Sequence, residues 1–180
     1  PETTVLVKQY KAFPKNEVDT VISILQKVYG VKTVIAKDQE LYPNAFTNVK
    51  SPRYRADSII KFQQKEINSK IDYVLGLTSK DISVTKKDES GNIKKPEYKY
   101  QDWGIMGLAY CPGESCVVST FRIKSKNKTV YFDRLKKVAV HEFGHNLGLP
   151  HCPNKKCVMT DAVESVKTID NAKLKLCDDC

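Results

Sequence analysis

All three histidines of this chain lie within eleven residues, in the stretch HEFGHNLGLPH. His141 and His145 are four residues apart, so on a helix both imidazoles project from the same face. Gly148 can adopt the left-handed conformation that ends a helix, and Pro150 cannot continue one. The chain must therefore turn back after this helix, which brings His151 towards the first two side chains.

Three imidazoles that converge in this way can bind one zinc ion, with zinc–nitrogen distances of about 2.0–2.1 Å. Three protein ligands leave a fourth position open for water, which is typical of catalytic rather than structural zinc. Glu142 follows the first ligand and can accept a proton from a water molecule whose pKa zinc lowers to about 7. We therefore expect His141, His145 and His151 to hold a catalytic zinc ion, with Glu142 as general base in peptide-bond hydrolysis.

Four of the six cysteines lie near the C-terminal end, in the pattern C-x4-C, nineteen residues, C-x2-C. Two close pairs separated by a loop are typical of a four-thiolate structural zinc site. Two disulfides or four reduced thiols are the alternatives. The first of these cysteines directly follows His151, so a structural ion would hold the turn that carries the third histidine. The four predicted ligands are Cys152, Cys157, Cys177 and Cys180, which brings the expected total to two zinc ions.

The other two cysteines, Cys111 and Cys116, flank a Pro-Gly-Glu-Ser turn between two predicted strands. They can face each other and form a disulfide, or pack as small apolar side chains. We favour packed thiols.

The order of predicted elements indicates an α/β or α+β domain, with a mixed sheet packed on helices. The polar stretch 80–101 is expected to form a surface loop or an exposed hairpin. The length of 180 residues favours one domain. Within it, 1–147 would form the part with the sheet and the active-site helix, and 148–180 a C-terminal part. The predicted strands are 4–9, 31–36, 71–77, 104–110 and 116–123, and the predicted helices are 16–30, with Asn16 as N-cap, 55–68 and 131–147.

The composition limits the partners of the chain. The net charge is +9, and lysine supplies most of the 30 basic residues. Because arginine is the residue that reads bases and phosphates, we expect no nucleic-acid partner, and at most a mild preference for acidic substrates. No apolar run approaches the roughly 20 residues that a membrane helix needs. The chain starts at Pro1, and we favour an exported monomer, trimmed of a leader, over a cytoplasmic one.

The last forty residues resemble the archaemetzincins, a branch of the metzincin metallopeptidases. The family pattern is HExxHxxGxxHC, four residues, Cys, one residue, Met, seventeen residues and CxxC, and this chain matches every fixed position. The resemblance implies an α+β, metzincin-like zincin fold with a twisted mixed sheet and a C-terminal tail bound by a four-cysteine zinc site. It also implies that Met159 forms the Met-turn, an apolar floor beneath the catalytic metal.

The resemblance further implies that the substrate lies extended along an edge strand, for which Gly107, Leu108 and Ala109 are the best candidates. It suggests aminopeptidase activity, which needs an anionic anchor for the free amino terminus, and Glu114 is one candidate. A non-catalytic, zinc-containing peptide-binding module is the alternative function. A nucleic-acid-binding zinc-ribbon tail is the third and weakest hypothesis.

Two features depart from the family pattern. Asp161 stands where some metzincins have a tyrosine that assists the metal site. Metzincins also end with a helix that the final cysteine pair would begin, whereas this chain stops at Cys180. Either the tail is cut short, or the helix lies at 162–174, with Val163, Val166 and Ile169 on one face.

Overall fold

The computed structural model describes residues 2–162 and 165–180. Its centre is a twisted five-stranded sheet in which β8 is an antiparallel edge strand and the other four strands are parallel. In sheet order the strands are β2 (Lys32–Ile35), β1 (Thr4–Gln9), β5 (Tyr73–Thr78), β9 (Ser115–Ser119) and β8 (Gly107–Ala109).

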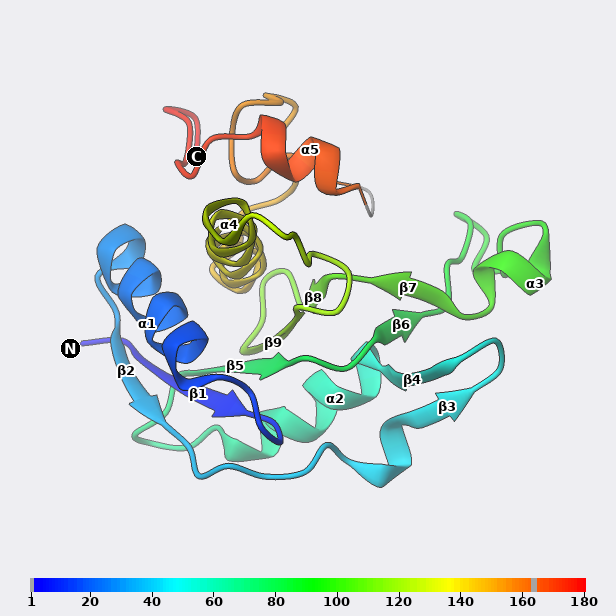
Figure 1. Cartoon of the computed structure of the whole chain (residues 1–180), viewed down its shortest axis with the longest axis horizontal. Helices are drawn as coiled ribbons and strands as arrows, with labels where there is room; N and C mark the ends of the chain where they lie inside the picture. Colours follow the sequence, from blue (N-terminus) through cyan, green and yellow to red (C-terminus); the bar gives the residue numbers. More distant parts are fainter. Residues whose placement is uncertain (1, 163–164) are drawn as a thin grey trace.

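Helices cover both faces of this sheet (Figure 1). Helices α1 (Lys15–Tyr29) and α4 (Lys128–Asn146) lie on one face, and α2 (Ala56–Gln63) lies on the other. The side chains of β9 alternate accordingly, because Cys116 and Val118 belong to the α1–α4 core, whereas Val117 packs with the α2 core. The predicted α+β architecture is confirmed.

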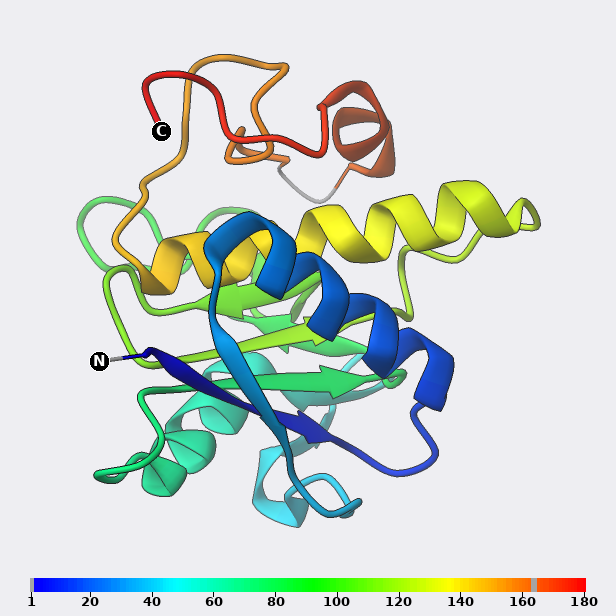
Figure 2. The same ribbon diagram turned by 90° about the vertical axis from the view of Figure 1, so that its left-hand side faces the viewer.

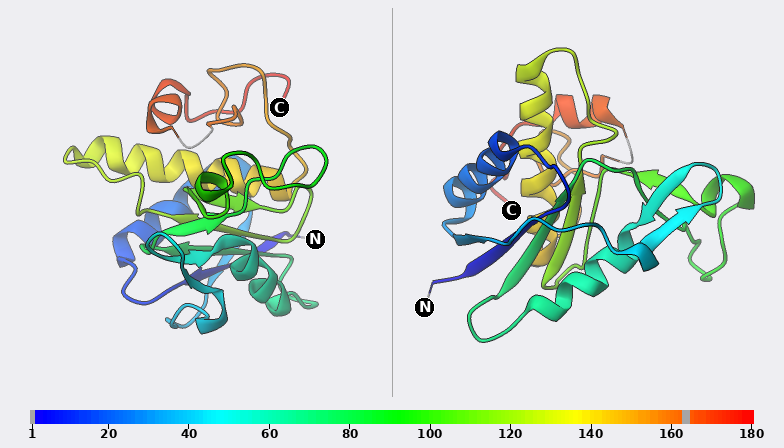
Figure 3. Two further views of the ribbon diagram at one scale, coloured as in Figure 1. Left: turned by 90° about the vertical axis from the view of Figure 1, so that its right-hand side faces the viewer. Right: turned by 60° about the horizontal axis from the view of Figure 1, so that its bottom comes forward.

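A second, four-stranded sheet extends to one side, together with α3 (Glu97–Tyr100) (Figures 1 and 3). Its strands, in sheet order, are β3 (Phe46–Asn48), β4 (Pro52–Arg55), β6 (Ile82–Val84) and β7 (Trp103–Ile105).

The prediction of one strand over 104–110 is wrong, because the chain bends at Met106 and contributes to both sheets. Strand β7 pairs with β6, whereas β8 pairs with β9. At the bend between β7 and β8, the Ser119 N–H donates to Met106 O at 2.9 Å. The strand breaks because its two halves pair with different, distant strands. The apolar pattern of 104–110 does not show this. Strands β7 and β8 are each the last strand of their sheet, so 103–109 passes from the edge of one sheet to the edge of the other.

Three further predictions need correction. Helix α1 begins at Lys15 rather than at an Asn16 cap, because the amides of Glu17 and Val18 donate to Pro14 O. The predicted helix 55–68 ends as the 3₁₀ turn η2 (Gln64–Glu66), and another 3₁₀ turn, η1 (Pro43–Ala45), precedes β3. The stretch 80–101 is not entirely exposed, since Ile82 of β6 is fully buried.

The C-terminal part, 148–180, lies over α4 on the side away from the sheet (Figure 2). The predicted helix 162–174 is shorter, α5 (Val166–Asn171), and Val163 lies outside the described residues. Arg134 of α4 forms an ion pair with Asp170 of α5 at 2.8 Å, and Ile169 is buried against α4. No helix in the described part of the chain is long and apolar enough to cross a membrane.

Candidate metal centre and active site

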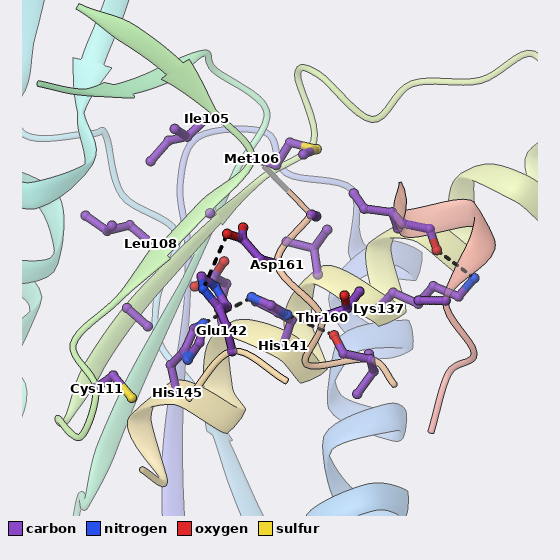
Figure 4. A pocket seen from close by; sticks show the side chains of 18 of the residues that line it. Ile105, Met106, Leu108, Cys111, Lys137, His141, Glu142, His145, Thr160 and Asp161 are labelled. Carbon is purple, nitrogen blue, oxygen red and sulfur yellow. Dashed lines mark hydrogen bonds and ion pairs between the residues drawn. The ribbon is translucent and has the colours of Figure 1, made fainter. Parts of the chain in front are cut away.

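His141 and His145 lie beside the strand that carries Leu108, β8 (Figure 4), and His151 converges on them. Two of them project from the last turns of α4, and the third returns from the turn after it. The ring centroids are 4.6 Å apart for His141 and His145, 4.8 Å for His145 and His151, and 5.3 Å for His141 and His151. Ring nitrogens of all three lie within 4.8 Å of one another, so one metal ion can contact each of them.

Backbone carbonyls orient the two helical imidazoles. His141 Nδ1 lies 2.8 Å from Val158 O, and His145 Nδ1 lies 2.7 Å from Leu149 O. Because a carbonyl only accepts, each Nδ1 carries the proton and each Nε2 presents a lone pair. The two Nε2 atoms are only 3.0 Å apart, and a cation between them removes the repulsion of their lone pairs. This donor set fits zinc.

The protonation state of these imidazoles also suits a metal ligand. Burial lowers the pKa of His141 to about 4 and lowers the pKa of His145 as well. Both rings are therefore neutral at neutral pH, as metal binding requires.

The turn after α4 positions the third histidine. Gly148 has a φ of 100°, in the left-handed region, as the sequence predicts. Leu149 N–H donates to Gly144 O at 3.0 Å, and Cys152 N–H donates to Met159 O at 2.9 Å, so both sides of the turn are held. His151 Nδ1 lies 3.7 Å from Asp161 Oδ2, which places a carboxylate behind the ring.

Glu142 is buried next to the histidines, with only 8% of its surface exposed. It packs against Gly107 of β8, where a Cβ atom would lie 2.7 Å from Glu142 Cγ and 2.9 Å from Oε1. Burial raises the pKa of Glu142 to about 8, and a divalent cation beside it would act in the opposite direction. The sequence marked Gly107 only as part of an edge strand, and nothing local shows that its missing side chain makes room for Glu142.

A cavity of about 440 Å³ lies between the β7–β8 edge and α4 with the C-terminal part (Figure 4). Ile105, Met106 and Leu108 line the strand side, and Val138 and Ile169 line the opposite side. The cavity contains the three histidines, Glu142 and Asp161, but Glu114 does not line it. Glu114 is therefore no anchor for a substrate amino terminus in this cavity.

The four C-terminal cysteines form a second cluster. Sγ atoms are 3.7 Å apart in the pairs Cys152–Cys177 and Cys157–Cys180, and all four lie within 4.8 Å of one another. A tetrahedron with zinc–sulfur distances of about 2.3 Å has edges of about 3.8 Å, so the cluster has the size of a zinc site. The Cys157 sulfur also accepts hydrogen bonds from the amides of Met159 and Cys177, each at 3.4 Å.

Cys111 and Cys116 do not face each other. Cys116 is buried and pairs across the sheet with Ala109, whereas Cys111 is exposed at the cavity. All six cysteines belong to the described residues, and none forms a disulfide. The packed-thiol prediction holds for Cys116 but is wrong for Cys111. Because the two cysteines form no disulfide, they give no support to the expectation that the protein is exported.

Met159 is fully buried beneath the site. Its sulfur faces Gly144 of α4, where a Cβ atom would lie 2.6 Å from Sδ and 2.8 Å from the Tyr29 hydroxyl. The same hydroxyl donates to Val140 O at 2.8 Å. Gly144 thus lets Met159 and Tyr29 approach the helix that carries the histidines.

Asn146 is a residue that positions the end of α4, and its role was not predicted from the sequence. It is 2% exposed, and its Nδ2 donates to Tyr110 O at 2.9 Å and to Ser115 O at 3.0 Å. These bonds join the end of α4 to the β8–β9 turn. The only indication in the sequence is that a polar residue directly follows His145. This position does not reveal that its partners are Tyr110 and Ser115.

Converging imidazoles, a buried glutamate and an adjacent strand edge define a class of enzyme, the zinc metallopeptidases. Comparison with known proteins places the chain in this class. Residues 4–180 match peptidase family M54, and the chain therefore belongs to that family, the archaemetzincins.

Relatives and solved structures agree with this assignment. The archaemetzincin of Haloquadratum walsbyi is 33% identical over 165 residues, covering 87% of this chain and 84% of the relative. The archaemetzincin of Halobacterium salinarum is 29% identical over 167 residues, covering 88% and 86%. The crystal structure of Methanopyrus kandleri archaemetzincin aligns with a TM-score of 0.78 at 25% identity, over 99% of this chain and 91% of that one. The Archaeoglobus fulgidus archaemetzincin, solved with malonate, aligns with a TM-score of 0.75 at 25% identity, over 98% and 97%.

Proposed function

We propose that the enzyme hydrolyses peptide bonds with Glu142 as general base, at a zinc ion held by His141, His145 and His151. The observation that carries this proposal is the placement of Glu142, buried in the same cavity as the histidines and against the edge strand. When bound, a zinc ion would act as a Lewis acid that polarises the scissile carbonyl and lowers the pKa of water. Glu142 takes the proton of the attacking water and returns it to the leaving amine.

Strand β8 would hold the substrate. As the last strand of its sheet, it has backbone groups that an extended peptide can pair with. The peptide would then lie between Gly107 and the histidines, with side chains directed into the two apolar walls of the cavity. Peptide addition to β8 therefore places a scissile bond next to Glu142.

Substitution of Glu142 tests the general-base role. We expect Glu142→Ala to keep its zinc and lose hydrolysis of a broad peptide library by about 100-fold or more. Glu89→Ala, at an exposed residue of the 80–101 stretch, is the matched control and should retain full activity. If the wild-type protein binds library peptides but cleaves none, the alternative of a non-catalytic peptide-binding module is supported instead.

We further propose a second, structural zinc ion bound by the four C-terminal cysteines. This ion would anchor 148–180, so that the whole chain works as one domain whose C-terminal part completes the site. The spacing of the sulfur atoms supports this assignment.

Aminopeptidase activity is the second candidate, and Asp161 favours it. Among the described residues that line the cavity, Asp161 is the one carboxylate besides Glu142. It would attract the ammonium group of a free amino terminus. Peptides with free and acetylated amino termini test this, since an aminopeptidase cleaves only the free form. Equal cleavage of both forms would exclude it.

A further inference from the structure

We propose that a cationic pocket beside β7 binds an acidic side chain of the polypeptide substrate. This pocket, of about 340 Å³, is separate from the catalytic cavity and shares no residue with it. Four of its seven lining residues are cationic and one is acidic. The lining residues are Lys50, Arg53, Lys99, Asp102, Trp103, Gly104 and Arg122.

The two arginines are held in place by buried carboxylates. Asp81, which is 5% exposed, lies 3.0 Å from Arg53 Nε and 2.8 Å from Arg122 Nε. Asp102, which is 2% exposed, lies 3.3 Å from Arg53 Nη1. Both guanidinium groups are therefore oriented before a ligand arrives, and both carboxylates are already paired.

The two lysines keep their charge available. Lys50 Nζ donates to the backbone oxygen of Lys99 at 2.8 Å, and Lys99 Nζ lies 5.6 Å from the Trp103 ring centroid. Within the described residues, neither ammonium group pairs with a carboxylate. The two lysines and two arginines carry four positive charges, and Asp81 and Asp102 carry two negative charges. The net charge of these six side chains is therefore +2, which suits a carboxylate ligand.

The pocket lies on the path of an extended substrate. Gly104 of β7 lines the pocket, and Gly107 of β8, three residues further along the chain, contacts Glu142. At about 3.3 Å per extended residue, this separation is at most about 10 Å, because the chain bends at Met106. A peptide that follows the β7–β8 edge would present the side chain three or four residues from the scissile bond to the pocket. This assignment rests on the proposed peptidase function, and it defines acidic peptides as preferred substrates.

Peptide cleavage tests the preference. A peptide series would carry Glu, Gln or Lys in turn at each of the four positions on either side of the cleaved bond. We expect Glu three or four residues away to raise kcat/KM about two- to fivefold over Gln, the range of an exposed ion pair. The Lys50→Gln/Lys99→Gln variant should lose this preference, whereas the control Lys61→Gln/Lys167→Gln, at exposed lysines outside the pocket, should keep it.

Fluorescence of Trp103, the single tryptophan, reports on the pocket without catalysis. We expect the Glu peptide to change it saturably, and the Lys50→Gln/Lys99→Gln variant to lose most of the response. If that response occurs but no peptide is cleaved, the pocket stands and the proposed function fails. If peptides are cleaved without preference for Glu, and fluorescence does not distinguish Glu from Gln, the pocket proposal is wrong and the proposed function stands.

Discussion

At the scale of single residues, backbone carbonyls orient two imidazoles of the candidate metal site. Val158 O and Leu149 O accept from the Nδ1 atoms of His141 and His145, and both Nε2 atoms point to one place. The histidine spacing was readable in the sequence because it is local. The carbonyls come from the segment after the helix, so their role appears only in the folded chain.

Substitution of Gly107 should lower activity without lowering stability. In Gly107→Ala, the new Cβ would meet the flexible end of Glu142 rather than the backbone, so the carboxylate moves and the fold remains. We expect kcat/KM to fall about 100-fold, as for a general base displaced by about 1 Å, with unchanged zinc content. Steady-state kinetics and metal analysis measure both. In a Glu142→Gln background the same substitution should cost little more, and an equal further loss would contradict this explanation.

The protonation of Glu142 predicts an acid limit for activity. The base works only when deprotonated, so kcat/KM falls as pH drops through its pKa. Burial raises this pKa from 4.5 to about 8, and a bound cation lowers it again. We therefore expect the midpoint of the acid limb between these two values, measured in a pH–rate profile. Because the pKa of His141 is lowered to about 4, zinc should remain bound over this range. A profile that is flat from pH 8 down to 4.5 would exclude this role for Glu142.

At the scale of elements, the site depends on how α4 ends. The predicted helix and turn are confirmed by α4 and by the left-handed Gly148, because helix periodicity and glycine conformation are local properties. The break of 104–110 into β7 and β8 was not predictable, since it depends on pairing with β6 and β9. Residues of β8 line the catalytic cavity, and Trp103 and Gly104 of β7 line the cationic pocket.

Substitution of Gly148 tests the turn. Its φ of 100° is strained for any residue with a side chain, so Gly148→Ala should lower the free energy of unfolding by about 1–3 kcal/mol. The displaced turn should also weaken zinc binding through His151. Gly91→Ala is the matched control, because Gly91 has a φ of 84° in an exposed turn far from the histidines in sequence. Thermal unfolding should show lower stability for both variants. Zinc analysis should show a loss of zinc only for Gly148→Ala. Loss of zinc in both would contradict a specific role for this turn.

At the scale of the whole molecule, the segment 148–160 links the two clusters of candidate metal ligands. Cys152 directly follows His151, and Val158 and Met159 lie between Cys157 and the histidines. In the proposed assignment, the C-terminal part would supply all four cysteine ligands of one site, and His151 and the Val158 carbonyl to the other. The four-residue and two-residue cysteine spacings predicted this cluster, but the fold decides that it lies on the far side of α4 from the sheet.

Metal analysis tests this organisation. We expect about two zinc ions per chain in the wild type and about one in His145→Ala. Cys177→Ser should lose the structural ion and expose 148–180 to limited proteolysis, because metal binding contributes to folding. Inductively coupled plasma mass spectrometry and proteolysis with trypsin measure these effects. Two zinc ions and unchanged proteolysis in Cys177→Ser would contradict the role of Cys177 as a ligand that holds 148–180 in place.

The sequence by itself determined the metal-binding residue types, their spacing and the helix that carries two of them. These features depend on helix geometry and side-chain chemistry, which act over a few residues. Only the tertiary structure decided that Gly107 makes room for Glu142, that Asn146 joins α4 to the β8–β9 turn, and that 103–109 contributes an edge strand to each of two sheets. Each of these depends on contacts between segments distant in the chain, and no local pattern encodes which segments will meet.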